Sequence, residues 1–448
     1  MNNLPPGPKS IDFVSLLRST FGEPGPVVRE FAAKYGDTFR TVATNGPITI
    51  TGDPEAIRAI FTADPDVFQA YAVEIAEPVF GTTSLVVSSG ARHKKDRKLL
   101  TPPFNAGSMR AYGATIAEAA EEAAQRWEAG RRFSMLETMQ DIALDVIIRV
   151  VFGVEGRERV DEVRAAVLRL IESLSPIIFV FPWSRRELFG IGPWARYKRA
   201  VTAYDDLLLS EIQRRRGAAE EHHDILSLML RARYDDGSAM SDRELLEQLR
   251  ALLFAGHETT AVTLACAFHW LHWEPHVLAK VLNEIDALGA GAEADAFASL
   301  PYLEAVCYEA LRLNPPVVDT GRAAREPFQL MGYTIPAGEG MNPSPLLLHM
   351  REDLYPEPEK FRPERFLERK YSPFEYIPFG GGARRCLGAA FAMYEMKIIL
   401  GTLLRKYRLR ALGDKNIAMV RRGLTLGPRG GVPMMLVDKR AAAQSPVL

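Results

Sequence analysis

The stretch PFGGGARRCLG at residues 378–388 constrains this chain more than any other feature. Its three consecutive glycines allow a tight turn that aims backbone amides inward, where any Cβ atom would clash. Arg384 and Arg385 bring positive charge to the thiol of Cys386, and the apolar residues that follow recur at helical spacing. The thiol should therefore lie near a helix N-terminus, where negative charge is favoured. These surroundings favour a metal-binding thiolate. A buried structural cysteine after a glycine-rich loop is the alternative.

Composition restricts the class of protein and its compartment. A chain of 448 residues can form two or three ordinary domains or one large one, and 47% apolar residues suffice for a sizeable core. The formal net charge of −1 gives no overall attraction to nucleic acid or to an anionic membrane. Three cysteines, Cys266, Cys307 and Cys386, form neither a disulfide framework nor a zinc cluster, which favours a reducing cytoplasm.

The sequence contains no sign of a membrane anchor. No apolar run reaches the length of a membrane-spanning helix, and residues 1–10 are too short and too rich in proline for a signal peptide. We therefore expect a soluble chain. The stretch Leu288–Ala298 is expected to be a surface loop, and the tail 441–448 to be disordered.

Periodicity predicts helices along most of the chain, with a few short strands. Asp53-Pro54 is a typical helix start, and Asn45-Gly46 between two β-branched runs is typical of a hairpin. The helix that begins at Asp53 is predicted to end at Phe61. Further helices are predicted over Val27–Tyr35, Ile116–Glu128, Asp141–Val151 and Tyr197–Arg215. The hairpin strands are predicted over Thr38–Val42 and Ile48–Thr51.

A long helix is predicted from Ser241 to Trp270. Ser241 and Glu244 form a capping box at its start. Its middle, AGHETT at residues 255–260, contains a glycine and two threonines, which weaken a helix interior because a threonine hydroxyl can bond back to a carbonyl. A long helix that is locally weak suggests a functional segment.

Two further motifs lie on predicted helices. His93 and Arg97 are four residues apart on one helix face, where they could grip an anionic group together; a solvated basic face is the alternative. Glu309 and Arg312 have the spacing of an i,i+3 salt bridge in the helix Tyr302–Leu313, which Asn314-Pro315-Pro316 ends.

These stretches together resemble the cytochrome P-450 family. The spacing Phe379-x-x-Gly382-x-Arg384-x-Cys386-x-Gly388 is similar to the family's haem-binding loop, and AGHETT to its oxygen-binding helix. The Glu309 and Arg312 pair with FRPERF at 361–366 is similar to its structural triad. The resemblance covers essentially the whole chain. It implies a mainly α single domain over residues 1–448 with small β-sheets, a triangular prism that holds haem between a long central helix and the cysteine loop.

The resemblance also implies roles for individual residues. Cys386 would be the axial ligand of the haem iron, whose thiolate favours O–O cleavage. Ala255 and Gly256 would leave room for dioxygen, and Glu258 and Thr259 would relay protons. The residues implied to hold the haem are His93, Arg97, Arg322, Arg384, Phe379, Gly380 and Gly388. Among these, the histidine and the arginines would bind the haem propionates. Glu309, Arg312 and Arg365 are scaffold, not catalysts.

Apolar segments without regular periodicity are expected to line a substrate pocket. They share aromatic and branched side chains, and the expected lining is Phe68, Tyr71, Val79, Phe80, Leu85, Val86, Val87, Phe179, Phe181, Phe254, Val317, Val318, Thr320, Leu424 and Thr425. Leu424 and Thr425 belong to the expected tip of the last hairpin. Asp319 is either exposed or a polar contact for substrate. Ordinary packed loops are the alternative for the segment 65–90.

The implied activity is monooxygenation of a lipophilic compound by hydroxylation or epoxidation, with a fatty acid or similar elongated molecule favoured. Nothing resembles a flavin, Fe–S or nicotinamide domain. Electrons would then come from a ferredoxin or flavodoxin with its NAD(P)H-dependent reductase, docked on the basic residues Arg92, Lys94, Lys95 and Lys98. The protein is expected to be a cytoplasmic monomer. A peroxygenase or isomerase and a haem-binding sensor are alternatives; the Glu258-Thr259 pair argues against a peroxygenase, and a sensor needs no such relay.

Overall fold

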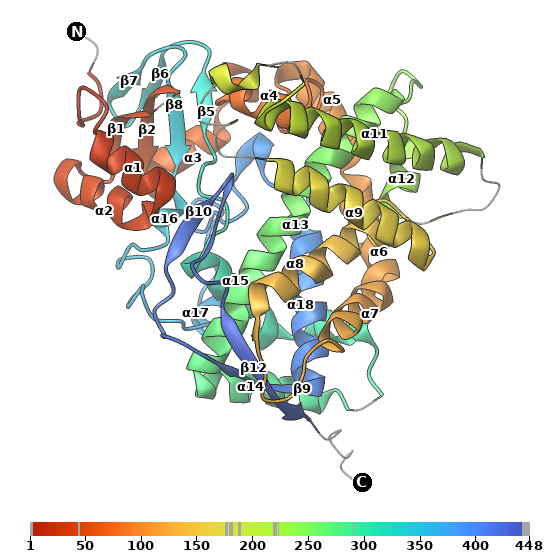
Figure 1. The fold of residues 1–448 in the computed structure, drawn as a ribbon. Helices are drawn as coiled ribbons and strands as arrows, with labels where there is room; N and C mark the ends of the chain where they lie inside the picture. The colour runs from red at the N-terminus through yellow and green to blue at the C-terminus, as the bar shows by residue number, and fades with distance from the viewer. Residues whose placement is uncertain are drawn as a thin grey trace. The chain divides into compact units, whose positions relative to one another are not determined.

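The computed structural model describes residues 3–43, 45–174, 178, 182–186, 190–217, 222, 224–289 and 291–440 (Figure 1). The expected disordered tail, 441–448, lies outside these residues. The chain forms two compact units. The first consists of Met1–Tyr71, Ile116–Ile142 and Glu258–Leu448, and the second of Ala72–Thr115 and Ala143–His257. The single domain expected over residues 1–448 stays a prediction.

The first unit combines helices with all of the named sheets. Its helices are α1 (Phe13–Phe21), α2 (Pro24–Tyr35), α3 (Pro54–Thr62), α14 (Pro275–Ala287), α15 (Pro301–Leu313), α16 (Pro345–Leu348), α17 (Arg365–Glu368) and α18 (Ala389–Lys406). Three helices contribute residues to both units: α7 (Gly113–Ala124), α8 (Met135–Val146) and α13 (Asp242–Trp273).

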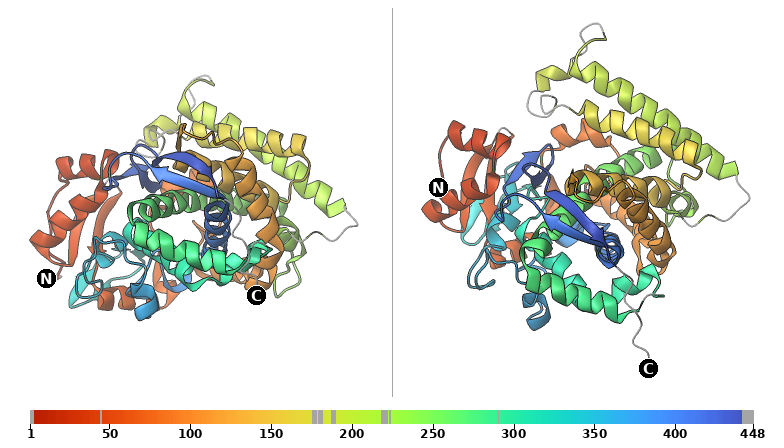
Figure 2. Two further views of the ribbon diagram at one scale, coloured as in Figure 1. Left: turned by 90° about the horizontal axis from the view of Figure 1, so that it is seen from below. Right: turned by 60° about the horizontal axis from the view of Figure 1, so that its bottom comes forward.

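A five-stranded sheet with the order β1-β2-β8-β5-β3 holds the N-terminal segment against residues 322–343. In Figures 1 and 2 the red N-terminal elements lie beside these cyan strands. Its strands are β1 (Thr38–Ala43), β2 (Gly46–Thr51), β3 (Phe68–Ala70), β5 (Arg322–Ala324) and β8 (Gly340–Pro343). The hairpin β1–β2 is confirmed, with Thr38 opposite Thr51.

The smaller sheets complete the first unit. Hairpin β6–β7 consists of Phe328–Leu330 and Tyr333–Ile335, and hairpin β10–β11 of Met419–Arg422 and Thr425–Pro428. A three-stranded sheet has the order β4-β12-β9, from Arg132–Ser134, Pro433–Lys439 and Tyr407–Ala411. The expected hairpin tip is confirmed for Gly423 and Leu424, which form the turn between β10 and β11, whereas Thr425 and Leu426 belong to β11.

The core of the first unit lies between α3 and the five-stranded sheet. Ile57, Ile60 and Phe61 on α3 pack against Phe68 of β3 and Met341 of β8. Asp53 caps α3, because its carboxylate accepts from the amide of Ala56 at 2.8 Å. This cap and the apolar face explain why a nine-residue helix is stable here.

The second unit is helical. Its elements are α4 (Val73–Phe80), α5 (Gly90–Leu100), α6 (Ala106–Met109), α9 (Arg157–Ser173), α11 (Pro193–Gly217), α12 (Ile225–Arg231) and the first part of α13, with a π-helical turn at Ile147–Val151. The capping box of α13 is confirmed: the Ser241 amide donates to Glu244 at 2.7 Å, and the Ser241 hydroxyl accepts from the Glu244 amide at 3.3 Å.

Two expectations need correction. Helix α13 is long and apolar enough to cross a membrane, although 67% of its apolar window is buried inside the protein, as in the core helix of a soluble protein. The stretch Leu288–Ala298 is not simply a surface loop, because the 3₁₀ turn Ala294–Ser299 buries Phe297 completely. A Cβ atom on Gly401 of α18 would lie 2.3 Å from Cγ of Phe297, so the glycine makes room for the ring.

Candidate functional site

The cysteine loop turns back on itself just before α18. The amide of Cys386 donates to the carbonyl of Phe379 at 2.8 Å, which closes the loop. Gly380 and Gly382 have φ angles of 62° and 60°, a region that glycine adopts readily. Helix α18 begins at Ala389, so the thiol precedes a helix N-terminus as expected.

The middle glycine of this loop is needed for a different reason. Gly381 has an extended backbone, but a Cβ atom there would lie 2.1 Å from a ring carbon of Phe61 on α3. At Gly388 a Cβ would meet nothing within 4 Å. The expectation that a Cβ atom would clash in the run of three glycines holds at Gly381 and at Gly382, where a Cβ would lie 2.4 Å from the carbonyl oxygen of Phe61. It is wrong at Gly380, where the nearest atom would be 3.8 Å away.

Cys386 differs from the other two cysteines in its accessibility. Cys386 is exposed, whereas Cys266 and Cys307 are buried. Burial raises the pKa of the Cys307 thiol to about 12 and that of Cys266 still further, which keeps both thiols protonated. The accessible thiol beside the glycine loop is thus the one placed to bind a metal.

Arg322 joins the sheet to the cysteine loop. Its guanidinium donates to the carbonyl of Gly381 at 2.6 Å and to that of Thr320 at 3.2 Å, and it lies 4.8 Å from the centre of the Phe61 ring. Burial, and then the charge of Arg384, lower its pKa to about 10. Within the described part of the chain it forms no ion pair with a carboxylate. A buried cation whose acceptors are neutral carbonyls suits an anionic group such as a haem propionate.

The middle of α13 carries the expected acid and alcohol. Ala255 is exposed, and a Cβ on Gly256 would lie 3.3 Å from Ile147. The bond from a threonine hydroxyl back to a carbonyl occurs one turn later than AGHETT, from Thr263 to Thr259 at 2.9 Å. Glu258 forms an ion pair with Arg422 at 3.3 Å.

Sequence reasoning missed two partners of this segment. Arg422 lies on β10, 164 residues from Glu258, and no local signal links them. Glu395 on α18 is fully buried, and burial raises its pKa to about 8 although Thr260 hydrogen-bonds it. A glutamate within an apolar helical run was the available signal for Glu395.

Glu309 is the centre of a buried charge network. Its two oxygens accept from Nε and Nη2 of Arg312 at 2.7 and 2.8 Å, and Nε of Arg365 reaches the same carboxylate at 3.0 Å. The amide of Arg362 adds a fourth bond at 2.9 Å. The structure thus brings together the three residues expected to form a triad.

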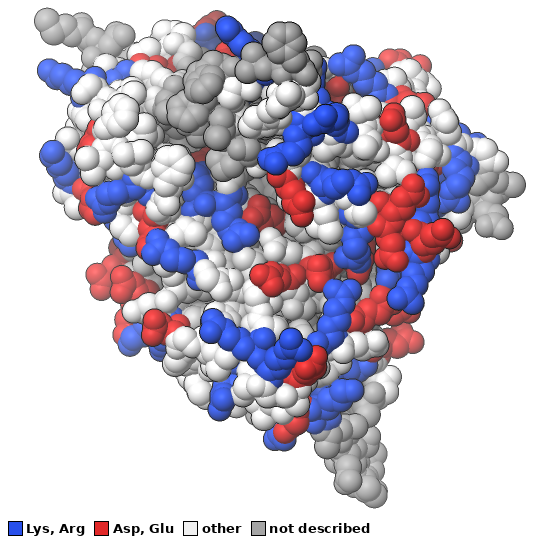
Figure 3. Space-filling model, in the orientation of Figure 1, with Lys and Arg blue, Asp and Glu red and all other residues white. Residues whose placement is uncertain are grey.

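The basic helix α5 has two different faces. His93 is buried and Arg97 half-buried, one turn apart as expected. The exposed face is largely neutralised by acids: Arg92 pairs with Asp96 and Glu244, Lys95 with Asp236, and Lys98 with Asp235. Mixed charge is general on the surface seen in Figure 3, where blue and red side chains are interspersed.

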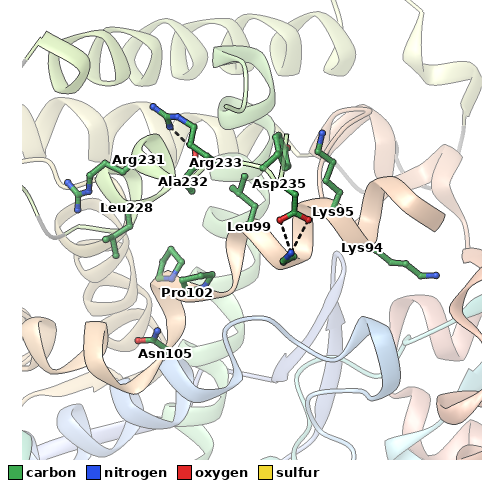
Figure 4. A pocket seen from close by; sticks show the side chains of 13 residues that line it. Lys94, Lys95, Leu99, Pro102, Asn105, Leu228, Arg231, Ala232, Arg233 and Asp235 are labelled. Carbon is green, nitrogen blue, oxygen red and sulfur yellow. Dashed lines mark hydrogen bonds and ion pairs between the residues drawn. The ribbon is translucent and has the colours of Figure 1, made fainter. Parts of the chain in front are cut away.

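An open groove of about 620 Å³ lies beside this face, within the second unit (Figure 4). Its floor is apolar, with Leu99, Pro102 and Leu228, and Lys94, Lys95, Lys98, Arg231 and Arg233 lie along it. Asp235 binds Lys98 across the groove at 2.7 Å. The expected docking patch is therefore more nearly neutral than its sequence suggests.

The expected pocket residues of the first unit differ in environment. Phe68 packs in the core, 5.2 Å from the ring of Phe328, and does not face open space. Val318 is buried, and Thr320 is held by Asn342 and Pro343. The hydroxyl of Tyr71 is buried without a partner among the described residues, and burial raises its pKa to about 12.

The remaining expected pocket residues of the first unit lie at or near the tip of hairpin β10–β11 and on the segment before β5. Leu424 is exposed and Thr425 buried, and Val317 is half-buried. Asp319 is exposed and pairs with Arg421 at 2.8 Å. Arg421 and its neighbour Arg422 therefore directly precede the hairpin tip.

In the second unit an apolar cluster forms around α4 and α13. Val79, Phe80 and Val87 pack with Phe254, and the rings of Phe80 and Phe254 meet edge-on at 5.8 Å. The Leu85 amide is anchored on Gln248, while Val86 is exposed. Phe179 and Phe181 lie outside the described residues.

Comparison with known proteins gives consistent results. The sequence model of the family described as Cytochrome P450 matches residues 5–432. A Mycobacterium tuberculosis protein named cytochrome P450 135B1 is 36% identical over 418 residues, covering 91% of this chain and 85% of the relative. A Mycobacterium bovis protein named cytochrome P450 138 is 34% identical over 441 residues, covering 96% and 95%.

Two solved structures match along nearly the full length. Retinoic acid bound cyanobacterial CYP120A1 gives a TM-score of 0.85 at 25% identity, covering 97% of this chain and 99% of that one. The heme domain of cytochrome P450DA gives 0.86 at 23% identity and covers 100% of both. The expected mainly helical fold with small sheets is thereby confirmed.

The buried network leads to a prediction about stability. Glu309→Ala should lower the free energy of unfolding by about 3–5 kcal/mol, because it leaves the cations of Arg312 and Arg365 buried without their acid. Glu30→Ala is the control, since its bidentate pair with Arg18 is exposed to solvent and should contribute little to stability. Thermal unfolding and soluble yield measure both. Equal losses in the two variants would contradict the role assigned to the network.

Proposed function

Because this chain belongs to the cytochrome P450 family and is a haem-thiolate monooxygenase, we propose an elongated lipophilic substrate and separate electron-donor proteins for it. A monooxygenase of this family inserts one atom of dioxygen into its substrate and reduces the other to water. The observation that supports this haem-thiolate chemistry is the exposed thiol of Cys386, in a loop whose shape depends on glycines and on the buried Arg322.

The residues present suit a haem. Cys386 is the proposed axial ligand, and Arg322 and Arg384 are the proposed partners of a propionate, with Phe379, Gly380 and Gly388 in the same loop. On α5, His93 and Arg97 are proposed to bind a propionate. When bound, the group supplies the site of dioxygen activation.

The acid and alcohol of α13 are proposed to manage protons during that reaction. Glu258 exchanges protons with solvent, and the hydroxyl of Thr259 passes them inward. Ala255 has only a methyl side chain and Gly256 has none, which leaves space beside them. Glu309, Arg312 and Arg365 act as scaffold.

The ligand assignment can be tested on Cys386 directly. Cys386→Ala should abolish the absorption band of the reduced, carbon monoxide-bound form that defines the family, because no other accessible thiol lies among the described residues. Cys307→Ala, a change of a buried thiol, is the control and should retain the band. A Cys386→Ala protein that keeps the band would show that another residue ligates the iron.

We propose a ferredoxin or flavodoxin with its NAD(P)H-dependent reductase as electron source, and α5 with its groove as the docking face. Lys95→Gln with Lys98→Gln should slow reduction by a ferredoxin several-fold without changing substrate affinity, and salt should slow the wild-type protein, because exposed charges are screened over about 10 Å at 0.1 M. The matched control is Lys360→Gln with Lys415→Gln, since each of these lysines also pairs with one acid.

One result would count against this docking face, and another against the need for donor proteins. One is an equal rate of reduction in the two double variants. The other is turnover with peroxide alone that matches turnover with donor proteins and NAD(P)H, which would favour a peroxygenase.

The proposed compartment is the cytoplasm, and the proposed state is a monomer.

For the substrate, we propose a fatty acid or a similarly elongated apolar molecule, hydroxylated or epoxidised away from its polar end. The apolar cluster of Val79, Phe80, Val87 and Phe254 supports this proposal. Leu424 offers an exposed apolar tip on the hairpin of the first unit. CYP120A1 binds retinoic acid, which is also elongated and apolar with a single carboxylate.

A series of saturated fatty acids of increasing length tests the substrate class. Each added CH₂ is worth about 0.8 kcal/mol when buried, so the dissociation constant should fall by up to about fourfold per carbon until the pocket is full. Spectral titration measures this, and a dicarboxylic acid of equal length is the control that should bind more weakly. A flat series, or one rigid polar compound that binds far better than all of them, would contradict the proposal.

A further inference from the structure

Hairpin β10–β11 presents two neighbouring arginines to opposite sides. Successive side chains of a strand point to opposite faces. Arg421 pairs with Asp319 at 2.8 Å and donates to the carbonyl of Ser19 at 3.4 Å. Arg422 instead reaches Glu258 on α13, with Nε 3.3 Å from Oε1. The second arginine therefore touches the acid proposed to deliver protons.

The path of the Arg422 side chain is built into the hairpin. Gly427 of β11 pairs with Val420 and lies diagonal to Arg422, and a Cβ atom there would lie 2.6 Å from Cδ of Arg422 and 3.4 Å from Val262 of α13. The missing side chain leaves the space through which the arginine passes. The hydroxyl of Thr425 also donates to the carbonyl of Arg422 at 3.1 Å, which holds the backbone at the turn.

The pair is only partly shielded from solvent. The side chain of Arg422 is 42% exposed and that of Glu258 26%. An arginine keeps its charge and only donates hydrogen bonds. The Glu258 oxygen held by Arg422 must therefore leave the guanidinium before it can carry a proton inward.

We propose that Arg422 is a positioning residue that holds Glu258 at rest, so that proton delivery depends on the position of hairpin β10–β11. This proposal rests on the relay role of Glu258 proposed above. The tip residue Leu424 is apolar and 43% exposed, directly after Gly423 in the turn. A lipophilic substrate that contacts Leu424 shifts the turn and draws Arg422 from Glu258, which links proton supply to occupancy.

The first test measures NAD(P)H oxidation by the holoenzyme with a ferredoxin and its reductase, without added substrate. Arg422→Gln should raise this rate about two- to fivefold, the size expected for loss of a partly exposed ion pair. Arg422→Lys, which keeps a cation, should stay close to wild type. Arg421→Gln is the matched control, because it removes the neighbouring ion pair on the other face and should leave the rate unchanged.

The second test does not depend on turnover. In the peptide covering residues 419–428, hydrogen exchange of the holoenzyme should be faster in Arg422→Gln and in Glu258→Gln than in the wild type. The double variant should exchange no faster than either single variant, because both changes break the same contact. Gly427→Ala should give the same increase, because its Cβ displaces the arginine without removing it. This variant also decides the question if Arg422→Gln does not fold.

The outcomes separate this inference from the function on which it rests. If Glu258→Gln changes the solvent isotope effect on turnover, but Arg422→Gln and Gly427→Ala change neither oxidation nor exchange, the inference alone is wrong. An effect of Arg421→Gln equal to that of Arg422→Gln would also overturn it, since any loosening of the hairpin would then suffice. If Glu258→Gln leaves the solvent isotope effect unchanged, the relay role is wrong and the inference fails with it.

Discussion

The buried ion pairs of Glu309 are the interactions on which the segment before the cysteine loop depends. Arg312, which pairs with it, also donates to the carbonyl of His349 at 2.8 Å. Burial and the charge of Arg312 lower the pKa of His349 to about 3, so its ring is neutral. Nε2 of this ring accepts from the amide of Ile377 at 3.0 Å, while Nδ1 donates to the carbonyl of Arg312 at 3.3 Å. A chain of satisfied polar groups thus runs from Glu309 to the residue that precedes the cysteine loop.

Features encoded by neighbouring residues could be predicted from the sequence. The capping box of α13, the cap of α3 and the hairpin β1–β2 each depend on a few adjacent positions. The pair Glu309 and Arg312 needs only one helical turn. The resemblance to the family supplied what local patterns could not, above all the partnership of Glu309 with Arg365.

Other features depend on contacts between distant parts of the chain, which no local pattern records. Gly381 is needed because Phe61 of α3 occupies the space of its Cβ atom. The sequence of α5 predicts a positively charged surface patch. In the structure, acidic residues 137 to 141 positions further along the chain neutralise Lys95 and Lys98. The placement of Phe68 in the core also follows from the packing of β3 on α3. Spacing identifies such residues, but only the fold decides what each one touches.

In the first unit, the residues around the cysteine loop and the residue at the tip of hairpin β10–β11 are held in different ways. This difference bears on how one scaffold can accept different substrates. Residues around the cysteine loop are tied to backbone carbonyls and amides, as Arg322 is to Gly381 and His349 to Ile377. At the tip of β10–β11, Leu424 lies in a two-residue turn whose exposed side chain can change without disturbing any of these bonds. Arg422 belongs to the same hairpin as this tip but contacts Glu258 of α13. Under the roles proposed for Leu424 and Glu258, a change of substrate preference at this tip would also alter proton delivery unless the contact between Arg422 and Glu258 is preserved.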